Sequence, residues 1–177
     1  MRKLPLDAIN LRILAELQED CSLTNAELAE RVGLSPSPCL ARVRALDEAG
    51  IILRRVALLD PIKIGASVSV FIQVTLEKQT ESQLDIFEAA VARFPEVMEC
   101  YLMTGDSDYL LRVVVSDTLA LQHFIVDRLS KTRGVANIRS SFALKQVKYK
   151  TVLPIEELFR PATGMSRKAV RNTRHGS

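Results

Sequence analysis

The chain has 177 residues, 47% of them apolar and 25% charged, which predicts one or two folded domains with a substantial core. No apolar run approaches the roughly 18 residues of a membrane span, and the N-terminus lacks the apolar stretch of a secretory signal, so we expect no membrane contact. Cys21, Cys39 and Cys100 lack the spacing of a disulfide framework or zinc site, which favours a reduced, cytoplasmic protein without metal.

The net charge of +3 is unevenly distributed along the chain. Residues 1–60 carry −1, residues 61–160 carry 0 and residues 161–177 carry +4. An anion bound by the body of the protein must therefore be held by local arrangement and not by net charge. Residues 159–177 are basic and lack periodicity, so they are predicted to form a disordered tail.

The first half of the N-terminal region predicts two amphipathic helices. Leucines recur at helical spacing between residues 11 and 17. Thr24 and Glu27 have the spacing of a capping box, in which each side chain bonds the other residue's backbone amide. Gly33 is expected to end the second helix.

The stretch SPSPCL, residues 35–40, predicts the start of a third helix. A proline in the first turn loses no hydrogen bond, because the amides there have no acceptor inside the helix. Either Ser35 caps the helix before Pro36, or Ser37 caps it before Pro38. The second register is favoured, because a residue that precedes proline avoids the α conformation. The helix is expected to bury three side chains: Leu40, Val43 and Leu46.

Two helices joined by a short turn that contains glycine are typical of a helix-turn-helix, predicted here within residues 1–60. The positive end of the third helix suits phosphates and base edges, and an arginine on it suits guanine. A capped helix that binds nothing, with solvated arginines, is the competing interpretation. The predicted DNA contacts are Thr24, Asn25, Ser35, Ser37, Pro38, Ala41, Arg42 and Arg44.

Residues 51–59 favour a strand, which we expect to act as a wing or connector, and residues 61–65 predict a linker. Residues 66–158 then predict a second domain of the βαββαβ, ferredoxin-like type. Its elements are expected at residues 67–76, 83–94, 97–103, 109–115, 118–131 and 136–151. The fold class is therefore α+β. The sheet face away from the helices is expected to be apolar, which predicts a second copy of the chain as a partner.

Within residues 6–158 the chain contains, in this order, the segments LDAINLRIL, TNAELAERVGLSPSPCLARVRALDEAGII and YLMTGDSDYLLRVVVSD. Together these segments resemble the Lrp/AsnC, or feast/famine, family of transcriptional regulators. It implies a DNA-binding domain, a domain that senses amino acids, and dimers that associate further into octamers. Asn10 stands where the family often has an acidic residue, and we expect a surface position for it. Ala41 and Ala45 stand at positions that are often charged, which leaves the preferred DNA sequence open.

The resemblance also implies an effector site at the turn that contains Gly105. A carboxylate, Asp106 or Asp108, suits an α-ammonium group, and the amides around Gly105 suit an α-carboxylate. Apolar surroundings favour a leucine-like or methionine-like effector. From the residues alone, a tight turn without ligand is the favoured interpretation. The predicted effector contacts are Leu102, Met103, Thr104, Gly105, Asp106, Asp108, Tyr109, Ser140 and Ser141.

An enzyme and an architectural DNA-binding protein are the alternatives to a regulator. An enzyme is disfavoured, because the only histidines are His123 and His175 and neither belongs to a catalytic motif. An architectural, nucleoid-type protein without effector shares every DNA-binding feature, so only ligand titration separates it from a sensor. No cofactor is expected besides the amino acid. Double-stranded DNA and further copies of the chain are the expected macromolecular partners.

Overall fold

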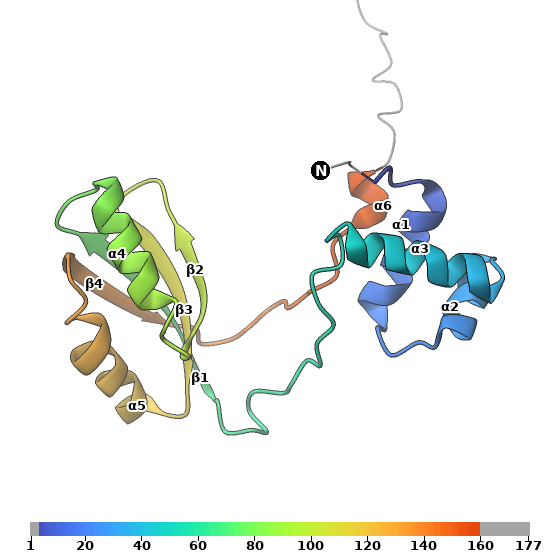
Figure 1. The fold of residues 1–177 in the computed structure, drawn as a ribbon. Coiled ribbons are helices and arrows are strands. Elements are labelled where there is room, and N and C mark those ends of the chain that lie inside the picture. The colour runs from blue at the N-terminus through green and yellow to red at the C-terminus, as the bar shows by residue number, and fades with distance from the viewer. Residues whose placement is uncertain (1–3, 160–177) are drawn as a thin grey trace, which may run out of the picture. The chain divides into compact units, whose positions relative to one another are not determined.

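The computed structural model describes residues 4–159 and forms two compact units (Figure 1). One unit contains residues 4–56 together with residues 148–159, and the other contains residues 57–147. The C-terminal segment therefore groups with the helical unit, although the sequence placed it with the second domain. Except for Phe159, the predicted tail lies outside the described residues.

The helical unit begins with caps that the sequence encodes locally. Asp7 caps the first helix by accepting a hydrogen bond from the amide of Asn10 at 2.7 Å. The predicted capping box is confirmed: Thr24 accepts from the Glu27 amide, and Glu27 accepts from the Thr24 amide at 2.8 Å. Gly33 ends the second helix with a φ of 71°, a conformation that favours glycine. The three helices are α1 (Ala8–Glu19), α2 (Asn25–Val32) and α3 (Pro36–Glu48).

The start of α3 uses the register that the sequence analysis did not favour. Ser35 is the cap, in extended conformation, and Pro36 is the first helical residue. Pro38 then falls at the third position of the helix, still within the first turn. The first amides of a helix have no acceptor inside it, so a second proline there costs no intrahelical hydrogen bond. Ser37 consequently adopts helical conformation despite the proline that follows it.

The core of the helical unit corrects one predicted position. Cys39 and Leu46 are completely buried and Val43 is partly buried, so these residues form the inner stripe of α3. Leu40, which was expected in the core, is 38% exposed. Cysteine behaves as a small apolar residue when it is buried, and here it occupies the place that the leucine was expected to fill. Leu40 therefore lies on the flank of the helix, outside the core.

The C-terminal segment closes this core against α1. The side chain of Gln18 accepts a hydrogen bond from the Leu153 amide at 2.8 Å, and its amide group lies 3.4 Å from the Leu153 carbonyl. The short helix α6 (Ile155–Leu158) follows, and Ile155 packs against the helical core. A glutamine that satisfies both backbone groups of one residue holds an irregular segment in place. This contact explains why residues 148–159 group with the first unit.

The second unit is a four-stranded antiparallel sheet with helices on one face (Figure 1). The strand order is β2-β3-β1-β4, as in a ferredoxin-like fold, so the predicted βαββαβ order is confirmed. The elements are β1 (Val68–Leu76), α4 (Glu81–Val91), β2 (Val97–Leu102), β3 (Tyr109–Val115), α5 (Thr118–His123), the π-helical turn η1 (Phe124–Leu129) and β4 (Val135–Phe142).

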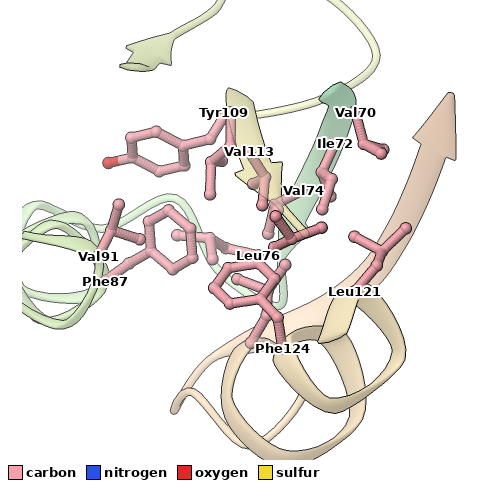
Figure 2. Packing of buried hydrophobic residues seen from close by; sticks show 13 residues of the cluster. Val70, Ile72, Val74, Leu76, Phe87, Val91, Tyr109, Val113, Leu121 and Phe124 are labelled. Carbon is pink, nitrogen blue, oxygen red and sulfur yellow. The ribbon is translucent and has the colours of Figure 1, made fainter. Parts of the chain in front are cut away.

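Alternating side chains of the two central strands build the core of this unit (Figure 2). Every second residue of β3 from Tyr109 to Val115 is buried, and β1 alternates in the same way from Val70 to Leu76. The two central strands thus present one face to α4, α5 and η1, as Figure 2 shows for Phe87 of α4 and Phe124 of η1. The other face is left to residues such as Phe71, Gln73 and Arg112, which the helices do not cover.

Two predicted strands differ in the structure. The last strand was expected to run to residue 151, but β4 ends at Phe142. Residues 51–59 were expected to form a wing or connector strand, yet within the described chain no strand forms there, and Leu53 is 90% exposed. Both segments contain apolar residues that favour a strand, but among the described residues no neighbouring strand completes their backbone hydrogen bonds. Among residues 4–159, no helix is both long and apolar enough to cross a bilayer.

Candidate DNA interface and ligand pocket

The outer face of α3 carries four exposed side chains at the spacing of one helical stripe. They follow one another at intervals of three, one and three residues and are Ser37, Leu40, Ala41 and Arg44. Each of the four is exposed, whereas the inner stripe of the helix is buried. This face is the one that a helix-turn-helix presents to the major groove.

Prolines limit what the N-terminus of α3 offers to a phosphate. Pro36 and Pro38 have no amide hydrogen, so Ser35 and Ser37 are the residues of the first turn that still carry one. Asn25 donates from its side chain to the Pro36 carbonyl at 2.8 Å, which joins the starts of α2 and α3. Asn25 thus orients α3, and Thr24 is engaged in the capping box.

The two arginines of α3 have different environments. Arg42 donates to the Asp7 carboxylate at 2.7 Å and to the side-chain oxygen of Asn10 at 2.9 Å. Asn10 is 6% exposed, so the surface position expected for it was wrong, and its side chain forms part of this polar contact. The Asn10 amide and the Arg42 guanidinium hold the pKa of Asp7 below its usual range.

Arg44, in contrast, is exposed and makes no ion pair with any of the described residues. Of the two arginines predicted to contact DNA, Arg42 is thus bound to α1 and Arg44 is available. Between residues 4 and 56 the chain has six arginines and eight carboxylates, a net charge of −2. Attraction of DNA by net charge is therefore not available to this segment, and individual contacts must provide the binding.

In the second unit, Asp108 ties the β2–β3 hairpin to the end of β1. It is 5% exposed, and its carboxylate accepts from the Leu76 amide at 2.7 Å and from the Gln79 side chain at 2.6 Å. Its own amide donates to the Val74 carbonyl at 3.0 Å. Both carboxylate oxygens are engaged within the fold, so Asp108 positions the hairpin and has no oxygen turned toward a ligand.

The hairpin closes a small polar cavity of about 150 Å³ on the sheet face that the helices leave uncovered. β1 and β4 pair so that Gln73 faces Arg139 and Thr75 neighbours Asn137, and the hairpin adds Asp106 and Ser107. The cavity thus combines a carboxylate, a guanidinium, two amides and two hydroxyls. Its volume is below that of a site for a large organic ligand, and its lining matches a small molecule with two charged groups.

Of the other predicted effector residues, one is buried and six are exposed. Tyr109 is 1% exposed and donates from its hydroxyl to Glu88 at 2.8 Å on the helix-covered side, where burial raises its pKa. Thr104 and Gly105 belong to the exposed turn, in which Gly105 has a φ of 128°. The remaining four are exposed: Leu102, Met103, Ser140 and Ser141. None of these seven residues lines the cavity.

Four cavity residues were not singled out in the sequence: Gln73, Thr75, Asn137 and Arg139. A sequence signal for them exists, because these polar residues alternate with apolar residues along the first and last strands and therefore share one face of the sheet. Their pairing across β1 and β4 is a long-range contact that a single sequence does not display. All six lining residues of the cavity are polar, so the apolar side chains expected around the effector are not found in it.

The uncovered sheet face is mixed and not uniformly apolar. Phe71 is 39% exposed and Tyr101 is 52% exposed, but Arg112 donates to Glu99 at 2.8 Å beside them. Tyr101 donates to the same carboxylate at 3.0 Å. The described residues contain no group of three or more histidine, cysteine or acidic side chains placed to hold a metal ion.

Comparisons with known proteins match both domains of the chain. Residues 6–52 match the family model of a winged helix-turn-helix DNA-binding domain, and residues 69–153 match that of the Lrp/AsnC ligand binding domain. The chain is 46% identical over 150 residues to the Bkd operon transcriptional regulator of Pseudomonas aeruginosa, which covers 85% of this chain and 98% of the relative.

Two further relatives carry effector names. A leucine-responsive regulatory protein of Rhizobium meliloti is 42% identical over 146 residues, 82% of this chain and 94% of the relative. The crystal structure of a transcriptional regulator from Neisseria meningitidis in complex with L-Met superposes with a TM-score of 0.82 at 42% identity. That alignment covers 87% of this chain and 99% of the other.

Proposed function

Because the chain belongs to the Lrp/AsnC family of transcriptional regulators, we propose that it binds specific DNA sequences and that a small amino acid controls this binding. The observation that carries the proposal is the polar cavity, in which Asp106 and Arg139 line the same 150 Å³. Every free α-amino acid has an ammonium and a carboxylate group. A cavity lined by one carboxylate and one guanidinium suits this pair of charges.

The side chain of the effector must then be recognised outside the cavity. The cavity is lined by no apolar side chain, whereas Leu102 and Met103 of the same hairpin are 59% and 41% exposed. Burial of these side chains against an apolar effector would be favourable. The names of the relatives, leucine-responsive in one and in complex with L-Met in another, support leucine or methionine as the effector.

Homodimers that associate further, as far as an octamer, are part of the proposal. Phe71 and Tyr101 leave apolar surface on the uncovered sheet face, and a second copy is the partner that two-fold symmetry provides. A dimer also reads two half-sites of DNA at once, which compensates for weak binding by each copy. The net charge of −2 over residues 4–56 makes this compensation necessary.

The connectivity of the chain offers a route from effector to DNA. β1 and β4 both line the cavity, and they are also the strands whose outer ends continue into residues 57–67 and 143–147, toward the helical unit. An effector that binds one assembly state better than another shifts the population of that state. The spacing of the DNA-binding helices then changes with the assembly state.

The cavity predicts which charges an effector needs. Asp106→Asn and Arg139→Gln are each expected to weaken L-methionine or L-leucine binding by about 10- to 100-fold, because each removes a charge-assisted contact of roughly 1.5–3 kcal/mol. Calorimetric titration of the full chain measures the affinity. Asp85→Asn, an exposed carboxylate on α4, is the matched control and should bind as the wild type does. Unchanged affinity in both cavity variants would exclude this site.

The sheet face predicts how the chain dimerises. Phe71→Asp is expected to raise the dimer dissociation constant at least 100-fold, since two phenylalanine side chains lose roughly 1.5–3 kcal/mol of burial each. Sedimentation velocity across a concentration series measures this change. Val126→Asp, which changes an exposed apolar residue of η1, should leave the dimer intact. A Phe71→Asp protein that sediments as a dimer at the wild-type concentration would place the interface elsewhere.

An architectural protein without effector is not favoured, because the matched relatives are transcriptional regulators and one solved relative is a complex with L-Met. Neither enzymatic activity nor a resident cofactor is part of the proposal. The direct test is a panel of the standard amino acids in a thermal-shift assay, followed by calorimetry and by mapping of genomic binding sites. Binding of no amino acid would leave the DNA-binding function without its sensor.

A further inference from the structure

Leu40 occupies an unusual place on the helix that faces DNA. It is 38% exposed, although Cys39 beside it is completely buried. It lies on one stripe with Ser37, Ala41 and Arg44, at the spacing of successive helical turns. The helix core is already filled by Cys39, Val43 and Leu46, so the leucine is not needed there.

The chemistry of the major groove limits what an exposed leucine can contact. Phosphates, sugars and most base edges there present polar groups, and the C5-methyl group of thymine is the apolar exception. This face of α3 can make few polar contacts with DNA. Arg42 is bound to Asp7 and Asn10, so Arg44 is the cation of α3 that is available to DNA. Two small or apolar side chains, Leu40 and Ala41, therefore form the middle of the reading face.

We propose that Leu40, with Ala41 beside it, contacts thymine methyl groups in the major groove and makes the protein select A·T base pairs at those positions. This inference rests on the proposed DNA-binding function and adds the base that one side chain reads. Discrimination arises because cytosine and the purines offer no methyl group at that place. A buried methyl group contributes to binding in proportion to the apolar area that leaves water.

The test removes the methyl group from the DNA and the side chain from the protein. Duplexes that bind the full-length chain are selected from a random library, and each thymine of the best site is then replaced by deoxyuridine, which lacks only the methyl group. For the wild type we expect one or two thymines per half-site whose replacement weakens binding about three- to fivefold, the effect of one buried methyl. With Leu40→Ala the same replacements should change affinity less than 1.5-fold.

Two further variants keep the result interpretable. Leu40→Met keeps an apolar side chain and should remain sensitive to the deoxyuridine replacements. Leu119→Ala, at a leucine of α5 that is 60% exposed, should behave as the wild type. Equal sensitivity in wild type and Leu40→Ala, or no sensitive thymine at all, would overturn the inference while DNA binding stands. Failure of the wild type to enrich any sequence would overturn both the inference and the proposed function.

Discussion

Replacing Arg44 by alanine is expected to lower the affinity for a selected DNA site by at least thirtyfold. A guanidinium that contacts guanine contributes about 1–3 kcal/mol of discrimination, and a two-fold dimer makes the contact twice. No second cation of α3 compensates, since Arg42 is bound to Asp7 and Asn10. Fluorescence anisotropy with a labelled duplex at fixed salt concentration measures the change, and the folded state of the variant is checked by its melting temperature.

Arg42→Ala provides the contrast that tests the assignment of the two arginines. The substitution removes the donor that bonds the side-chain oxygen of Asn10, a residue that is 6% exposed. The free energy of unfolding should therefore fall by about 1–2 kcal/mol. Arg44→Ala should leave this free energy within about 0.5 kcal/mol of the wild type, as for most surface substitutions. If Arg44→Ala bound DNA normally while a fully folded Arg42→Ala did not, the roles of the two side chains would be reversed.

Replacing Asp108 by alanine is expected to destabilise the second unit by about 2–4 kcal/mol and to abolish effector binding. The substitution removes the acceptor of the Leu76 amide and of the Gln79 side chain, and a buried donor left unpaired costs about 1–3 kcal/mol. For a unit of this size, residues 57–147, such a loss should lower the melting temperature by roughly 10 °C or more. Differential scanning calorimetry of the full chain follows the transition of this unit.

Asp106→Asn is the matched comparison for Asp108, since the two carboxylates belong to the same hairpin. Asp106 is exposed and lines the cavity, so its substitution should reduce ligand binding and leave the melting temperature unchanged. Asp108→Asn retains one acceptor oxygen and should lose less stability than the alanine variant. A stable Asp108→Ala protein that binds ligand normally would show that the hairpin is held without this carboxylate.

Local sequence signals predicted the elements that build both sites. The spacing of Thr24 and Glu27 predicted the capping box of α2, and the alternation of residues 109–115 predicted β3. These signals depend on neighbours in the chain, because a cap needs a residue three positions away and a strand needs alternate faces. The helix-turn-helix and the ferredoxin-like order of strands followed from such local features.

Features that depend on distant residues were not predictable in the same way. The bond of Arg42 to Asp7 joins residues 35 positions apart, and the pairing of Gln73 with Arg139 joins the first strand to the last. Leu40 and Cys39 are adjacent and point about 100° apart around the helix, so which one is buried depends on how α3 is rotated against the other helices. The strand-like pattern beyond Phe142 has no partner strand within the sheet, and periodicity does not report on partners.

One measurement tests the amino-acid control of DNA binding most directly. The affinity of the full-length chain for its selected duplex is measured by anisotropy with increasing L-methionine, and in parallel with N-acetyl-L-methioninamide, which has the same side chain but neither charge. The cavity with Asp106 and Arg139 predicts that only the free amino acid changes the DNA affinity. An equal response to both compounds, or to neither, would contradict recognition of the two charged groups.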